Sequence, residues 1–149
     1  MIRPLVAGLV SGLLVIGSAK LADRPHEAPA RAESAAYLVS DDAGADVDAA
    51  LDRAAENGKR VLLVMGANWC HDSLALAGSL ESERIAPLVR DRYELVYVNV
   101  GMPQKGDGHN LGIARRFGLD DLPGTPNLLV LTAEGELVNA ETATSWRNA

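Results

Sequence analysis

Apolar residues in the middle of the chain follow two spacings, one typical of helices and one typical of buried strands. In residues 46–57 they recur every three or four positions, which is the spacing of one helix face. The sequence Asn57-Gly58 that follows is a common helix end. The continuous apolar run at 61–65 predicts a strand buried on both faces, and a turn at 66–68 separates it from a helix predicted at 71–80.

The same alternation continues through the second half of the chain. The pattern predicts helices at 83–92, where Pro87 should either kink the helix or mark its first turn, and at 111–117, before Gly118. It predicts a glycine-rich loop at 101–110 and strands at 94–100, 127–132 and 137–139, the last two joined as a hairpin. Helices that alternate with strands indicate an α/β fold, whose sheet is covered by helices on both faces.

The N-terminal segment has the layout of an export signal. Residues 1–19 place one arginine before an uncharged apolar run and end in small residues. Cleavage is expected after Ala19, and less favourably after Ala22, because Lys20 would then be the third residue before the cut. The apolar run at 4–19 is shorter than the roughly 20 residues of a membrane-spanning helix, so an uncleaved anchor is the weaker interpretation. We therefore expect a periplasmic or secreted protein, attached to a membrane only if this segment is retained.

The next segment separates the export signal from the folded domain. Residues 20–36 are rich in alanine, proline, glutamate and arginine, and they show little apolar periodicity. This composition predicts a flexible linker. The folded domain is then expected to span residues 37–149.

Charge and cysteine content narrow the function. The net charge of −6 comes without any basic block, which argues against a nucleic-acid partner. Cys70 is the only cysteine, so no disulfide can form within the chain. In an exported protein its thiol is free, bonded to another chain or reactive, and the alternative is an inert side chain that packs as a small hydrophobic group.

The position of Cys70 favours a reactive thiol. It stands between the strand predicted at 61–65 and the helix predicted at 71–80. At a helix N-terminus, unpaired backbone N–H groups and the positive end of the helix dipole both stabilise a thiolate. They lower the pKa of the thiol, and the thiolate is the form that attacks disulfides.

Three stretches carry a resemblance to a known family. "WCHDS" at 69–73 follows a buried strand, "GTP" at 124–126 precedes the penultimate strand, and "NLLVLTAEGELV" at 127–138 makes the closing hairpin. In these motifs and their spacing, residues 46–139 resemble the thioredoxin superfamily, most closely the bacterial thioredoxin-like proteins in which Gly-Thr-Pro replaces the shorter Ile-Pro of thioredoxin. The resemblance implies a thioredoxin-like fold with a central mixed β-sheet flanked by helices.

The chain also departs from that family. Cys70 corresponds to the nucleophilic cysteine, but Ser73 stands where the resolving cysteine belongs. Ser73 cannot expel a substrate from a mixed disulfide, although it can donate a hydrogen bond to the thiolate. Val64 occupies the position of the buried acid of thioredoxins, so an ordinary dithiol reductase is not expected. Only ten residues follow Asn139, where family members have a closing helix, so either that helix is very short or the sequence is truncated.

The resemblance implies roles for the neighbours of the thiol. Trp69, Thr125 and Pro126 are expected to contact the substrate, with a cis peptide bond before the proline and the Thr125 backbone presented to an extended substrate. His71 and Asp72 follow the cysteine directly, and they are expected to modulate the charge around the thiol.

These observations predict an exported monothiol exchange protein. Cys70 would attack a disulfide or a glutathione adduct, and an external thiol would resolve the mixed disulfide, as in isomerisation or deglutathionylation. The expected partners are client proteins with disulfides or thiol adducts, and an external thiol or reductase. The alternative is a redox-inactive thioredoxin-fold binding module or chaperone.

A metal site is the main rival chemistry. Cys70, His71, Asp72 and His109 are all of ligand type. An adjacent Cys and His rarely bind one ion, so we expect no metal, and no cofactor either.

Overall fold

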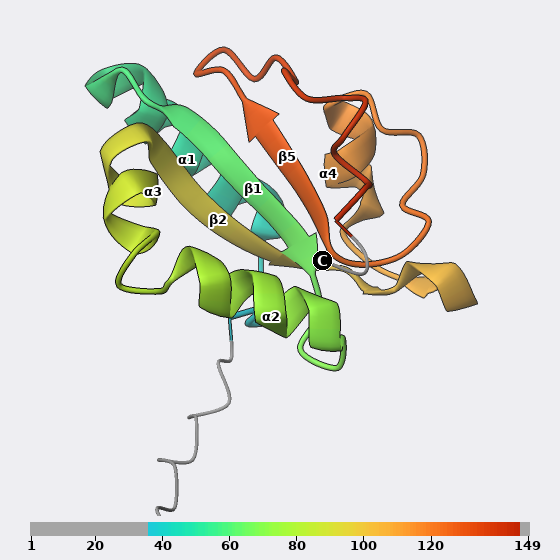
Figure 1. Ribbon diagram of the computed structural model, residues 1–149. Helices are drawn as coiled ribbons and strands as arrows, with labels where there is room; N and C mark the ends of the chain where they lie inside the picture. The colour runs from blue at the N-terminus through green and yellow to red at the C-terminus, as the bar shows by residue number, and fades with distance from the viewer. Residues whose placement is uncertain (1–35, 147–149) are drawn as a thin grey trace, which may run out of the picture. The chain divides into compact units, whose positions relative to one another are not determined.

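The computed structural model describes residues 36–146, so the signal segment at 1–19 and nearly all of the linker at 20–36 lie outside the described residues. The elements are α1 (Ala43–Asn57), β1 (Arg60–Gly66), α2 (His71–Leu80), α3 (Ala86–Arg92), β2 (Tyr93–Asn99), β3 (Gly101–Met102), the 3-10 helix η1 (Pro103–Lys105), β4 (Asp107–Gly108), α4 (Leu111–Arg116) and β5 (Asn127–Leu131). Strand β1 is central in the main sheet, parallel to β2 and antiparallel to β5 (Figure 1). The mixed α/β architecture predicted from the sequence is therefore confirmed.

The two faces of the sheet carry separate hydrophobic clusters. Val61, Leu63 and Met65 of β1 pack with α1 and α4, whereas Leu62 and Val64 pack with α2 and α3. Figure 1 shows α1 behind the sheet, with α2 and α3 on the opposite side. Because both faces are covered, a strand in this position needs apolar side chains at every residue, which explains the continuous run in the sequence.

Helix α1 begins three residues earlier than its apolar spacing predicts. The Asp42 carboxylate accepts a hydrogen bond from the Ala45 N–H at 2.9 Å, so this side chain caps the first turn. The helix ends at Gly58, whose φ of 71° is left-handed. The sequence predicted this end because glycine adopts that conformation without a steric penalty.

The predicted hairpin forms only in part. The Val138 N–H donates to the Val130 carbonyl and the Thr132 N–H donates to the Glu136 carbonyl, both at 2.9 Å. Instead of a second strand at 137–139, the chain forms one isolated bridge between Leu131 and Leu137. The Asn139 side chain accepts from the Val130 N–H and donates to the Leu128 carbonyl, both at 2.8 Å. These are the backbone groups that a regular partner strand would use, so the prediction of a strand was wrong at this point.

Two predicted segments have a different internal structure from the one expected. Helix α3 starts at Ala86, after a stretch of turns, and Pro87 lies in its first turn, where a missing N–H costs nothing. The glycine-rich loop at 101–110 contains the short ladder β3–β4 around η1. Residues 140–144 form turns, and among the described residues no helix follows β5.

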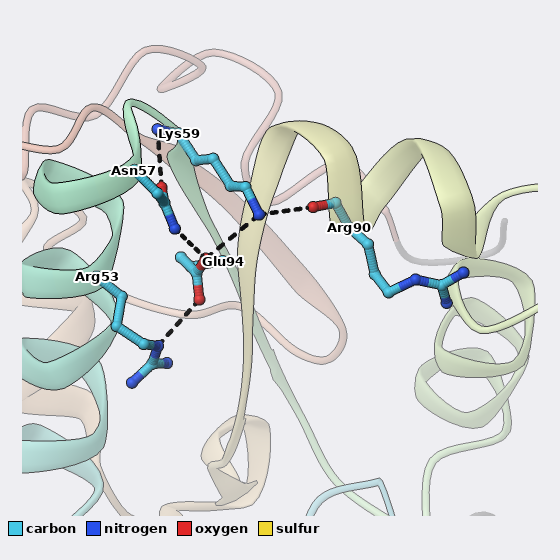
Figure 2. Close-up of polar contacts among 5 residues, drawn as sticks. All are labelled: Arg53, Asn57, Lys59, Arg90 and Glu94. Carbon is cyan, nitrogen blue, oxygen red and sulfur yellow. Dashed lines mark hydrogen bonds and ion pairs between the residues drawn. The ribbon is translucent and has the colours of Figure 1, made fainter.

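A polar network joins α1, β2 and α3 at one end of the sheet (Figure 2). The Glu94 carboxylate accepts from Arg53 Nε at 3.0 Å and from Asn57 Nδ2 at 2.7 Å. Lys59 Nζ lies 3.7 Å from the same carboxylate and donates to the Arg90 carbonyl at 2.8 Å. The hydrogen bond from Arg53 is the main cause that holds the pKa of Glu94 below its ordinary value.

No helix within residues 36–146 is both long enough and apolar enough to cross a membrane.

Candidate active site

Cys70 lies where β1 gives way to α2. It is the N-cap residue of α2, with extended backbone angles of φ −89° and ψ 116°. Its N–H donates to the Ala67 carbonyl at 3.1 Å, and its own carbonyl accepts from the Leu74 N–H at 3.1 Å.

The surroundings of the Cys70 sulfur lower the pKa of its thiol. Burial raises that pKa, but hydrogen bonds from the side chains of Ser73 and Thr125 and from the backbone N–H groups of Ser73 and Asp72 outweigh it. All these donors favour the charged form. In the protonated form, the thiol donates to the Thr125 carbonyl across an Sγ–O distance of 3.5 Å.

Ser73 is fully buried in the first turn of α2. Its Oγ accepts from the Ala67 N–H at 3.4 Å, which leaves the hydroxyl proton for the thiolate. A buried hydroxyl with a backbone donor on one side and a sulfur on the other is held in place. The catalytic role of Ser73 stays a prediction.

Thr125 and Pro126 lie on the loop before β5 and come up against the cysteine. Both are buried, and the peptide bond between them is cis. The Thr125 Oγ1 is buried without a hydrogen-bond partner among the described residues while the thiol is protonated. It therefore has a proton to donate when Cys70 ionises.

A depression of about 290 Å³ opens beside the thiol. Besides Cys70, it is lined by Trp69, Asp72, Gln104 and the segment 123–125. Trp69 is half exposed, and its Nε1 donates to the Gly101 carbonyl at 3.0 Å. This bond fastens the indole to the loop that carries Gln104. Gln104 was missed from the sequence because nothing in a glycine-rich loop indicates which side chain turns toward the site.

The two residues after the cysteine lie differently. The side chain of His71 is 96% exposed, and its Nδ1 is 3.7 Å from an Asp72 carboxylate oxygen. Asp72 lines the depression, whereas His71 does not.

His109, the fourth candidate metal ligand, bonds elsewhere: its Nε2 is 3.1 Å from the Asn99 side-chain oxygen. Within residues 36–146, no three His, Cys, Asp or Glu side chains come together as a metal site would require.

Tyr37 packs against the residues that carry the thiol, and no sequence pattern indicated this role. Its hydroxyl donates to the Ser73 carbonyl at 3.2 Å. Its backbone N–H donates to the Asn68 side chain at 3.1 Å, and its carbonyl accepts from the side-chain amides of Asn68 and Asn99. The ring is fully buried directly against Gly66. Tyr37 therefore fixes the strand end, the turn and the first turn of α2 that carry the thiol.

Two comparisons match this arrangement. A family model described as thioredoxin-like matches residues 42–133, a range that includes Cys70, Ser73 and Thr125. A crystal structure of a disulphide isomerase from Xylella fastidiosa Temecula1 matches with 30% sequence identity and a TM-score of 0.62, covering 76% of this chain and 86% of that chain. No curated protein sequence matches. The chain therefore belongs to the thioredoxin-like family.

Proposed function

We propose that the protein is an exported monothiol thiol-disulfide exchange protein that acts through Cys70. The observation that carries the proposal is the position of this thiol at the start of α2, where Ser73 and Thr125 lower its pKa. Similarity to a disulphide isomerase supports thiol-disulfide oxidoreductase chemistry in general. The single thiol of this chain supports the narrower, monothiol form of that chemistry.

The first step forms a mixed disulfide. The Cys70 thiolate attacks one sulfur of a client disulfide, the client S–S bond breaks, and a bond forms between Sγ and the attacked sulfur. The other client sulfur leaves as a thiolate and takes a proton from water. The Thr125 carbonyl has already lost the thiol as its donor when Cys70 ionises, and the sulfur carries no proton in the mixed disulfide either. An N–H group of the bound client can take that place.

The second step releases Cys70. Since Ser73 cannot attack the mixed disulfide, another thiolate must do so. When that thiolate belongs to the client, a new client disulfide forms, and the reaction is an isomerisation without net oxidation or reduction. When it belongs to an external thiol, that thiolate attacks Sγ, and the client sulfur leaves in reduced form while Cys70 stays bonded to the external sulfur. A second external thiol then attacks that external sulfur, which frees Cys70 and leaves the two external thiols joined as a disulfide.

The alternative function is a redox-inactive binding module or chaperone. The observation that favours it is the burial of Cys70, whose exposed fraction is only 9%. A large client must reach the sulfur through the depression at Trp69 and Thr125. If that access is closed in solution, the same surface can bind a partner without exchanging disulfides.

Isomerisation of a scrambled client separates these functions. Ribonuclease A with randomly paired disulfides is incubated with the protein and a trace of free thiol, and recovered ribonuclease activity is followed. The wild-type protein should accelerate the recovery, and Cys70→Ser should not. Thermal melting checks that the variant folds. Equal rates for the two proteins would refute the exchange function and favour the binding module.

Export is a separate part of the proposal, supported by the charged, apolar and small-residue order at 1–19. The mature protein is then expected to begin at Lys20, and less favourably at Asp23. N-terminal sequencing of the protein from its producing cell measures this. An intact Met1 in the soluble cytosolic fraction would exclude export.

A further inference from the structure

Gln104 lies on a short hairpin that follows β2. Strands β3 and β4 pair antiparallel and η1 connects them, so residues 101–108 form one compact unit, the Gln104 hairpin. The 3-10 helix begins at Pro103 and ends at Gly106, whose φ of 77° is left-handed and whose N–H donates to the Pro103 carbonyl at 3.1 Å. These constraints define the backbone on both sides of Gln104.

Hydrogen bonds fasten the Gln104 hairpin to the active site and to the end of β2. The Gly101 carbonyl accepts from Trp69 Nε1, and the Gly101 N–H donates to the Asn99 side-chain oxygen, both at 3.0 Å. At the other end of the hairpin, the His109 N–H donates to the Val100 carbonyl at 3.2 Å. Since both ends are held, the hairpin places Gln104 beside the thiol as a fixed part of the domain.

The side chain of Gln104 lines the depression beside Cys70, together with Thr125. It is exposed, and within residues 36–146 its amide makes no hydrogen bond. A side-chain amide carries one carbonyl acceptor and two N–H donors without a formal charge. A molecule that enters the depression can therefore bond to either kind of group.

An uncharged amide in this place suits the backbone of a peptide. Each peptide group offers an N–H and a C=O, and Gln104 can bond to both kinds. The Thr125 carbonyl is freed when Cys70 ionises, so it can accept from a second peptide N–H. The indole N–H of Trp69 is already bonded to Gly101, which leaves its apolar face for the substrate. A small disulfide lacks the peptide groups that would fill the two polar contacts.

We infer that Gln104 is a substrate-binding residue, whose amide hydrogen-bonds to the backbone beside the attacked cysteine and makes the site favour disulfides carried on polypeptides over small disulfides. This inference rests on the proposed function and names its substrate class. Cys70 remains the nucleophile, and Gln104 makes no contact with the reacting sulfurs in this scheme.

Two uncharged activated disulfides test the inference. The peptide acetyl-Ala-Ala-Cys-Ala-Ala-amide and 2-mercaptoethanol are each prepared as 2-pyridyl mixed disulfides, and attack by Cys70 on the non-pyridyl sulfur releases 2-thiopyridone, which is followed by absorbance. The ratio of the peptide rate to the mercaptoethanol rate cancels the reactivity of the thiol itself. The same ratio for attack by free N-acetylcysteine gives the intrinsic difference between the two disulfides, and we expect the protein to exceed it.

Matched variants of η1 separate the amide from the hairpin that carries it. Gln104→Ala should lower the ratio about fivefold, the effect of one lost hydrogen bond between neutral groups. Lys105→Ala, at the next exposed position of η1 and outside the lining of the depression, should leave the ratio unchanged. A protein ratio equal to that of N-acetylcysteine, or a ratio that both variants alter equally, overturns the inference. Failure of both disulfides to react overturns the proposed function instead.

A direct measurement needs no variant, because Gln104 is the only glutamine in the chain. Labelling with glutamine that carries ¹⁵N in its side chain gives one pair of amide signals in the NMR spectrum. The mixed disulfide of Cys70 with the peptide should shift this pair, and the mixed disulfide with 2-mercaptoethanol should not. Signals that stay in place in the peptide adduct would overturn the inference.

Discussion

At the scale of single residues, Ser73 makes this site different from a dithiol site. It lies within hydrogen-bond reach of Cys70 and is fully buried, so it stabilises the thiolate but offers no second sulfur. Val64, in the position where thioredoxins have a buried acid, is packed in the apolar cluster against α2 and α3. The missing thiol and the missing acid are therefore consistent with each other.

A second thiol should partly restore dithiol chemistry. In Ser73→Cys, the new sulfur would lie beside Cys70, and the pair should form an internal disulfide. Reduction of insulin by the variant with dithiothreitol should exceed that of the parent, but only in part, because Val64 provides no base for the second thiol. If the parent already reduces insulin as fast as the variant, Ser73 does not limit the reaction.

The sequence indicated the residues whose local position decides their role, and it did not indicate those brought in by tertiary contacts. Cys70 follows from a strand end and a helix start, whereas Ser73 and Thr125 were indicated by the family resemblance. Gln104 and Tyr37 reach the site only through packing of distant segments, across 34 and 33 positions from Cys70. No periodicity or turn signal marks such contacts.

At the scale of elements, the junction of β1 and α2 depends on one close approach. A Cβ added to Gly66 would lie 2.6 Å from the ring of Tyr37 and 2.8 Å from the Ser73 Oγ. Both neighbours are fully buried, and Tyr37 is held by hydrogen bonds on both sides. Neither has room to move without disturbing the first turn of α2.

Two glycine substitutions test this junction. Gly66→Ala should lower the free energy of unfolding by about 1–3 kcal/mol, because it overpacks a filled space. Gly78→Ala, in the same helix as Ser73 with no atom within 4 Å of the new Cβ, should raise it by about 0.5–1 kcal/mol. Urea unfolding measures both. Equal effects of the two substitutions would contradict the close packing at Gly66.

The ends of helices were predictable where the residue that ends or starts the helix is adjacent to it in the sequence. Gly58 ends α1 as expected, and Pro87 lies in the first turn of α3. The strand expected at 137–139 is reduced to one bridge, because after Val138 the side chain of Asn139 bonds to the backbone of β5 in place of a partner strand. Asparagine competes with backbone ladders in this way, but the sequence alone does not say where its amide is directed.

At the scale of the whole molecule, the network around Glu94 ties α1 and α3 to β2 (Figure 2). Because the pKa of Glu94 is lower in the folded protein than the ordinary value of about 4.3, its ionisation favours folding. This contribution is complete above the unfolded pKa, and it is lost as the pH falls through the folded pKa.

Removing the charge of Glu94 should therefore lower the free energy of unfolding at neutral pH and not in acid. Glu94→Gln should lower the free energy of unfolding by about 1 kcal/mol at pH 7, a modest figure because the partner side chains are partly exposed. The difference from the parent should shrink as the pH falls below about 4. Glu56→Gln, at an exposed position of α1, is the control. A difference that persists unchanged in acid would show that the charge is not responsible.

The architecture could be predicted from the sequence because alternating helices and buried strands admit few layered arrangements. The apolar pattern does not predict the strand order β2-β1-β5. Periodicity places side chains on faces, but pairing between strands depends on contacts distant in sequence.

The central claim is that Cys70 is a nucleophile with a stabilised thiolate, and its alkylation rate as a function of pH tests this most directly. Iodoacetamide reacts with the thiolate alone, so the midpoint of the rate profile reports the pKa of Cys70 in the folded protein. We predict a midpoint below the value of about 8.5 for an ordinary cysteine. Ser73→Ala should move the midpoint upward, because it removes the strongest of the hydrogen bonds that lower this pKa. A midpoint at or above about 8.5, or a thiol that reacts only after unfolding, would contradict the account.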